Sequence, residues 1–65
     1  MGRGFYTDIA LILHRHKCKF VRQGKGSHEI WYSPITNKTF SVPVTVVSRN
    51  TANGILKQAG LEEKI

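Results

Sequence analysis

The stretch CKFVRQGKGSHEIWYSPITNKTFSVPV, residues 18–44, decides the fold, because it contains three runs rich in β-branched and aromatic residues separated by two turn sequences. These runs predict strands at residues 18–23, 28–33 and 39–44. The glycine, proline and asparagine residues of the intervening segments are typical of turns. Pro43 has no N–H to donate and favours an edge strand or a strand end. Consecutive strands joined by short turns predict an antiparallel meander.

A helix is predicted before this meander, at about residues 6–17. Its apolar face recurs at spacings of four, three and four residues and consists of Phe5, Ile9, Ile12 and His16. Thr7 is the candidate N-terminal cap, and Asp8 follows in the first turn, where the helix dipole favours an acid.

A second helix is predicted after the meander and extends to Ala59. Ser48 or Asn50 can cap its start, and Gly60 can supply the left-handed residue that ends it. Its apolar stripe consists of Ala52, Ile55, Leu56 and Ala59. Gly54 is unusual inside a helix, where close packing or simple tolerance can account for it. We expect the tail, residues 62–65, to fray.

The order of these elements is α-β-β-β-α, which predicts an α+β fold with two helices packed on one face of a three-stranded antiparallel sheet. This is the topology of the double-stranded-RNA-binding domain. The 65 residues are expected to form one domain, residues 1–65, with a core that supplies only a few kcal/mol of net stability. The single cysteine, Cys18, cannot form an internal disulfide. A partner protein is therefore the expected stabiliser.

Charge indicates the kind of partner. Ten Lys and Arg residues against four acids give a formal net charge of +6, which attracts polyanions. Nucleic acid is the leading candidate, followed by an anionic membrane and an acidic protein. No apolar run approaches the roughly 20 residues that a membrane span needs, and no signal peptide is evident, so we expect a cytoplasmic protein.

Metal and cofactor sites are not indicated. His14 and His16 are two residues apart on the predicted helix and point in different directions, so with Cys18 they make a weak zinc site. The four acids are scattered along the chain, whereas two-metal phosphodiester hydrolysis needs carboxylates gathered at one point. We expect neither a metal nor a cofactor.

The alternation along residues 28–33 leaves the position of the tryptophan open. His28, Ile30 and Tyr32 point to one face of the sheet, and Glu29 and Trp31 to the other. If the Ile30 face meets the helices, Trp31 lies on the open sheet and can stack a base or anchor a partner. If not, Trp31 belongs to the core.

Three short runs together resemble a known family. They are Arg22 with Gly26-Ser27-His28, then Val42-Pro43, and then the run ILKQAG at residues 55–60. In these runs the chain resembles the HicA toxins, or YcfA-like family, which are small bacterial mRNA interferases of toxin–antitoxin pairs. The resemblance spans nearly the whole chain. It departs from the family's pattern after the first helix, where many relatives have Gly-Phe and this chain has Lys17-Cys18.

The resemblance implies that RNA is cut and that His28 is the catalytic residue. RNA carries its own nucleophile, the 2′-hydroxyl, and a histidine suits the role of general acid or base near neutral pH. Phosphate could be held by Arg22 and Lys25, with the four backbone N–H groups of residues 24–27 forming an anion nest. The resemblance also implies an inhibitory HicB-type antitoxin, bound in a hetero-oligomer.

Two other functions remain open. The first is a non-catalytic RNA-binding module of the double-stranded-RNA-binding type. Such modules usually carry a lysine cluster at the start of the second helix, where this chain has only Arg49. The second is a module that binds only protein. The Gly-Ser-His run, which the RNA-binding modules lack, favours the nuclease over the first, and the second predicts no affinity for nucleic acid.

Overall fold

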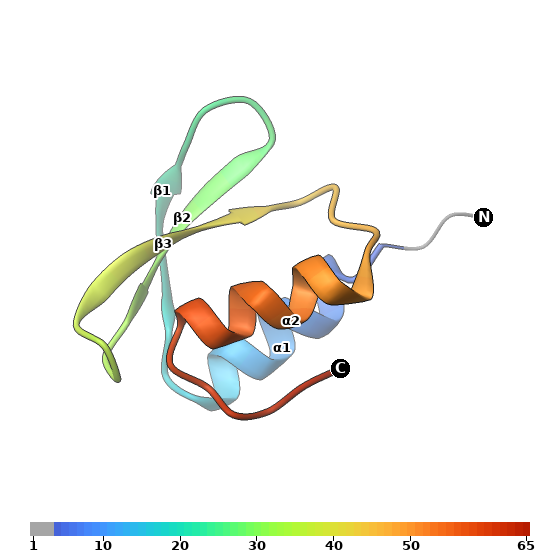
Figure 1. Cartoon of the computed structure of the whole chain (residues 1–65). Helices are drawn as coiled ribbons and strands as arrows, with labels where there is room; N and C mark the ends of the chain where they lie inside the picture. Colours follow the sequence, from blue (N-terminus) through green and yellow to red (C-terminus); the bar gives the residue numbers. More distant parts are fainter. Residues whose placement is uncertain (1–3) are drawn as a thin grey trace.

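Three antiparallel strands in the order β1-β2-β3 form the sheet, and two helices cover one of its faces (Figure 1). This arrangement comes from a computed structural model that describes residues 4–65. The elements are α1 (Tyr6–Arg15), β1 (Lys19–Gln23), β2 (His28–Ser33), β3 (Lys38–Pro43) and α2 (Arg49–Gln58). The predicted fold class is confirmed. No helix within the described residues is long and apolar enough to cross a membrane.

The register of the sheet assigns side chains to its two faces. Residues directly opposite each other on neighbouring strands share a face, and alternate residues change face. The helix-covered face includes Phe20, Glu29, Trp31, Ser33, Phe40 and Val42, and the open face includes Lys19, Arg22, His28, Ile30, Tyr32, Thr39, Ser41 and Pro43. The β1–β2 register shifts between Phe20 and Arg22, which marks a β-bulge at Val21.

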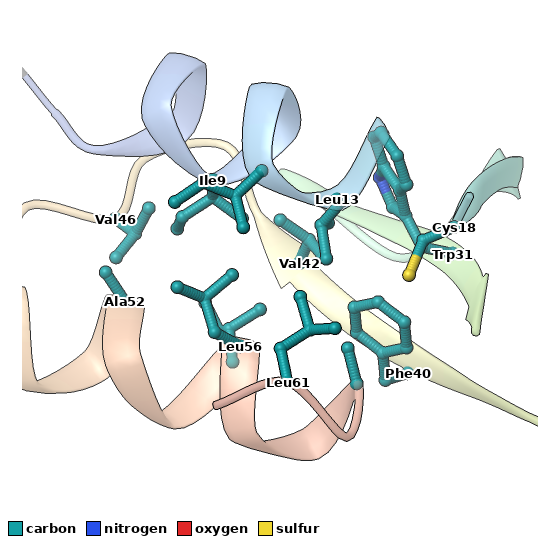
Figure 2. Packing of buried hydrophobic residues seen from close by; sticks show 13 residues of the cluster. Ile9, Leu13, Cys18, Trp31, Phe40, Val42, Val46, Ala52, Leu56 and Leu61 are labelled. Carbon is teal, nitrogen blue, oxygen red and sulfur yellow. The ribbon is translucent and has the colours of Figure 1, made fainter. Parts of the chain in front are cut away.

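The core lies between the helices and the Trp31 face of the sheet, so Trp31 is a core residue. Its side chain is only 2% exposed, and His14 and Phe20 meet its ring edge-on. Figure 2 shows the apolar side chains that fill this layer, which include Ile9 and Leu13 of α1, Val42 of β3 and Leu56 of α2. A burial of this extent provides most of the stability of so short a chain.

Helix α1 ends earlier than predicted, because Lys17 takes the left-handed conformation with φ 69°. The N–H of Lys17 donates to the carbonyl of His14, and the N–H of Cys18 donates to that of Leu13, which together form a Schellman cap. The prediction that the helix runs to residue 17 was wrong by two residues. The predicted cap at Thr7 was also wrong, since the helix starts at Tyr6 after Phe5, which makes no side-chain cap.

Helix α2 has the caps that were predicted. The Ser48 hydroxyl accepts a hydrogen bond from the N–H of Thr51, and Gly60 ends the helix with φ 84°. The N–H of Leu61 donates to the carbonyl of Leu56, and the Leu61 side chain is buried. A Cβ at Gly54 would meet no atom within 4 Å, so this glycine is tolerated rather than required by packing.

The C-terminal tail is held against the helices, so the prediction that it frays was wrong. The carboxylate of Glu63 pairs with Arg15 and accepts a hydrogen bond from His16 at the end of α1. The N–H of Ile65 donates to the side-chain oxygen of Asn53, and the Ile65 side chain packs on the core. Both attachments join residues far apart in sequence, which local patterns do not predict.

Candidate functional site

The turn between β1 and β2 carries the predicted site and stands clear of both helices (Figure 1). Gly26 has φ 61°, and the N–H of His28 donates to the carbonyl of Lys25 over 3.1 Å. Positive φ at the first central residue alone is the pattern of a type II′ turn, which suits a hairpin and favours glycine there. The Ser27 carbonyl accepts from the N–H of Val44, so the turn is also tied to the end of β3.

The main chain of His28 is held on both sides while its side chain stays exposed. Its carbonyl oxygen accepts one hydrogen bond from the N–H of Gly24, at 2.8 Å, and another from Nε2 of Gln23, at 3.0 Å. Gln23 Nε2 also donates to the Gly26 carbonyl. The turn is therefore braced from within, and the imidazole projects from a fixed point of the backbone into solvent.

The orientation of the imidazole is set by one contact. Nδ1 of His28 lies 3.3 Å from the carbonyl oxygen of Lys25. Because a carbonyl oxygen can only accept, this contact places the proton of a neutral imidazole on Nδ1. Nε2 has no hydrogen-bond partner within the part of the chain that the structure describes. Its lone pair is then free to accept a proton from a bound molecule.

Gly24 pairs with His28 across the β1–β2 hairpin and lies close to the main chain of His28. A Cβ at this position would come within 3.0 Å of the His28 carbonyl oxygen and 3.2 Å of Cδ1 of Ile30. The glycine therefore permits the close approach of the two strands next to the imidazole. It also leaves space for the side chain of Ile30, which lies on the same face of the sheet as His28.

The β-bulge at Val21 places Arg22 on the same face as His28. Without it, Arg22 would share the face of Phe20, because residues two apart in a regular strand point the same way. With it, Arg22 lies opposite Ile30, and it is a diagonal neighbour of His28 at a typical Cα separation of about 7–8 Å. The guanidinium is exposed and makes one bond, to the carbonyl of its neighbour Gln23.

The other predicted phosphate-binding groups lie in the turn itself. The side chain of Lys25 is exposed. The N–H groups of Lys25, Gly26 and Ser27 donate no hydrogen bond to other described residues, whereas that of Gly24 is used by His28. The predicted nest is therefore reduced by one donor, and three consecutive N–H groups remain available to an anion.

The acids of the chain are kept away from His28. Glu29, its neighbour in sequence, points to the helix-covered face, where its carboxylate accepts hydrogen bonds from Tyr6 (2.7 Å) and Trp31 (3.0 Å). Burial raises the pKa of Tyr6 to about 12, and the bond to Glu29 adds to that rise. The carboxylate thus anchors the start of α1 to β2, and it does not act on the same side of the sheet as His28.

The weak zinc set considered from the sequence is not brought together. His14 lies against Trp31, His16 binds Glu63, and Cys18 is buried. Burial raises the pKa of the Cys18 thiol, and a hydrogen bond with Ser33 opposes that rise. Among residues 4–65, no group of three His, Cys, Asp or Glu side chains could hold a metal ion.

Gln23 is the residue that the sequence reasoning missed. Its side-chain amide braces the turn through two carbonyl groups, those of Gly26 and His28. The available signal was an amide side chain at the last strand position before a glycine-rich turn, where it can bond to exposed turn carbonyls. This signal is weak, since such residues are frequent on exposed strands.

The fold and this histidine-bearing hairpin define a small α+β protein of double-stranded-RNA-binding-domain topology with a basic, exposed site. A family model described as the HicA toxin of bacterial toxin–antitoxin systems matches residues 6–61. The chain therefore belongs to the HicA toxin family, and its role is that of a toxin in a toxin–antitoxin pair. Searches of curated proteins and of solved structures gave no match.

Proposed function

We propose that this toxin is an endoribonuclease that cuts mRNA and that His28 is its catalytic residue. The observation that supports this most directly is the exposed imidazole, with Nε2 free, on a braced hairpin. A general base must reach the proton that it removes, and this imidazole is open to a substrate of any size. We further propose that residues 1–65 act as one domain in the cytoplasm, where mRNA is present.

The proposed reaction is transfer of the phosphate to the ribose. Nε2 of His28 takes the proton of a 2′-hydroxyl, the 2′-oxygen attacks the adjacent phosphorus, and the bond to the 5′-oxygen breaks. Water can protonate the departing oxygen, because the site is open to solvent. Arg22 and Lys25 supply positive charge to the phosphate, and the free N–H groups of Gly26 and Ser27 can bind its oxygens. The products carry a 2′,3′-cyclic phosphate and a 5′-hydroxyl.

A HicB-type antitoxin is the proposed inhibitor. The family pairs a toxin with an antitoxin. The net charge of +6 on this chain would attract an acidic partner, and His28 is exposed to it. Covering the hairpin would block access of RNA. A complex that binds only the folded toxin should also melt at a higher temperature than the toxin alone.

The test is an RNA cleavage assay with purified protein, in the presence and absence of a chelator. Cleavage in both conditions, with ends that carry a cyclic phosphate or its hydrolysed form, is the expected result. Loss of activity with chelator, or products with a 5′-phosphate, would contradict the proposed reaction. Complete absence of cleavage would contradict the proposed activity.

The second candidate is a non-catalytic RNA-binding module, which the fold itself favours. Against it, the start of α2 offers only Arg49, whose guanidinium lies 5.8 Å from the centre of the Phe5 ring. Binding of RNA without any cleavage in the same assay would select this candidate.

A further inference from the structure

We propose that the open face of the sheet is the platform on which a single-stranded RNA lies, with Tyr32 stacking one base and Lys19 and Arg22 binding phosphates. This inference rests on the proposed function, because it identifies the substrate path that leads to His28. It assigns to Tyr32 the role that the sequence alone left open for Trp31. The observations that carry it are the charge, the chemistry and the geometry of this face.

The charge of the open face has one sign. Lys19 and Arg22 project from β1, and the structure places no acidic side chain of residues 4–65 beside them. The four acids lie elsewhere: Asp8 on α1, Glu29 on the covered face, and Glu62 and Glu63 after α2. A polyanion therefore meets no repulsive carboxylate between Tyr32 and His28.

Tyr32 is placed as a stacking residue. It lies on the central strand, flanked by Lys19 on β1 and Thr39 on β3. Its hydroxyl donates to the side-chain oxygen of Asn37 at 2.7 Å, which restrains the ring, and the side chain remains partly exposed. A restrained aromatic ring among a lysine and hydroxyl groups matches the platforms on which single-stranded bases stack.

The geometry connects this platform to the catalytic histidine. Tyr32 and His28 are four residues apart on β2, a distance of about 13 Å along the strand. Arg22 lies opposite Ile30, midway between them. A strand of RNA that passes over Tyr32 and Arg22 thus presents a different nucleotide to His28. The nucleotide whose base stacks on Tyr32 would therefore lie outside the pair of nucleotides between which the RNA is cut, and it would still influence cleavage.

A partly exposed tyrosine ring on the open face favours unpaired RNA over a duplex. Bases can stack on a protein ring only where they are not stacked in a helix, whereas duplex RNA is recognised through its backbone and its minor groove. The covered face of the sheet cannot take this role, because the helices fill it. The open face is the remaining broad surface that also bears His28.

The experiment measures RNA affinity in a His28→Ala background, so that no cleavage disturbs the equilibrium. A short fluorescein-labelled single-stranded RNA is titrated by anisotropy over a range of salt. Tyr32→Ala should weaken binding about 5- to 100-fold with little change in salt dependence, and Tyr32→Phe should bind like the parent. Arg22→Gln and Lys19→Gln should each lower the slope of log K against log salt by about 0.7.

The matched controls lie outside the platform. Lys57→Gln removes an exposed charge from the last turn of α2, and Phe20→Ala removes a half-exposed ring from the covered face. Each control should keep the parent affinity at a temperature where melting curves show it folded. The same RNA annealed to its complement should bind more weakly than the single strand.

Three outcomes would overturn the platform. These are equal affinity of Tyr32→Ala and the parent, a larger loss in Lys57→Gln than in Arg22→Gln, and a preference for the duplex. The binding data do not depend on catalysis, so a toxin that fails to cut RNA would refute the proposed nuclease while the titrations still decided the platform. Conversely, if the wild-type protein cuts RNA and Tyr32→Ala leaves the RNA affinity unchanged, only the platform would be refuted.

Discussion

Gly24 lies directly opposite His28 in the β1–β2 hairpin, and its N–H donates to the His28 carbonyl oxygen over 2.8 Å. This pairing closes the hairpin at the point where the candidate catalytic side chain leaves it. The absence of a Cβ at residue 24 relieves this pairing of a tight contact, since a Cβ would approach that same oxygen to 3.0 Å. The position of the imidazole thus depends on a residue that has no side chain of its own.

Gly24→Ala should therefore impair the site more than the fold. The added methyl requires Ile30 or the main chain of His28 to shift by a few tenths of an ångström, so the cleavage rate should fall by less than the roughly 100-fold that a misplacement of about 1 Å can cost. The measurements are the RNA cleavage rate and the melting temperature. Gly54→Ala is the control, because it meets no atom within 4 Å and should raise stability by about 1 kcal/mol with unchanged cleavage. Equal cleavage by both variants would show that the hairpin tolerates the shift.

His28→Ala should reduce cleavage about 10²- to 10⁴-fold and relieve any growth inhibition, because a general acid–base group is removed. The fold should persist, since the side chain is exposed and leaves no core cavity. His14→Ala removes an exposed histidine from α1 and serves as the control with normal cleavage. If a folded His28→Ala protein cuts RNA at the wild-type rate, His28 is only a structural residue of the turn and has no catalytic role.

Lys17→Gly should stabilise the protein by about 1 kcal/mol. Lys17 has φ 69° at the end of α1, a conformation that costs a residue with a Cβ roughly 1–2 kcal/mol relative to glycine, partly offset by the greater freedom of an unfolded glycine. Chemical denaturation measures the difference. Gly60→Ala is the opposite case, because its φ of 84° is combined with contacts of 2.9 Å to Ile35 and Thr36, and it should destabilise. A destabilised Lys17→Gly variant would mean that the lysine side chain contributes to the cap.

Glu63 should make the stability of the folded protein depend on pH in the acid range. Its hydrogen bond with His16, and then that with Arg15, holds the pKa of this carboxyl below its ordinary value of 4.5. A group whose pKa is lower in the folded state than in the unfolded state stabilises the folded protein. This stabilisation is complete when the pH is above the unfolded-state pKa, and it is lost as the pH falls through the folded-state pKa. Glu63→Gln should therefore melt below wild type at pH 7, and the difference between the two should disappear as the pH falls through the lowered pKa of Glu63. A constant difference at all pH values would assign the loss to packing of the tail instead.

The order of the elements and the alternation within each strand could be predicted from the sequence, because both follow from neighbouring residues. The turn chemistry of Gly26 and the caps of Ser48 and Gly60 are equally local, and the structure contains all three. The end of α1 was predicted two residues too late, because a lysine gives no sequence signal for the left-handed backbone conformation that Lys17 adopts. The attachment of the tail through Glu63 could not be predicted, since it links positions about 48 residues apart.

The residues of the candidate site could be named from the sequence, but their arrangement could not. His28, Lys25, Gly26 and Ser27 are consecutive or nearly so, and a single turn brings them together. Arg22 reaches the same face only through the bulge at Val21, and the brace from Gln23 needs the folded turn.

The sequence by itself determined that Trp31 and Tyr32 point to opposite faces, because successive side chains of a strand alternate. It did not determine which of them is buried, since the two choices satisfy the pattern equally. Only the packing of α1 and α2 decided this, by covering the Trp31 face and leaving Tyr32, Arg22 and His28 on the open one. The physical reason is that alternation is local, whereas burial depends on the free energy gained when distant apolar surfaces meet.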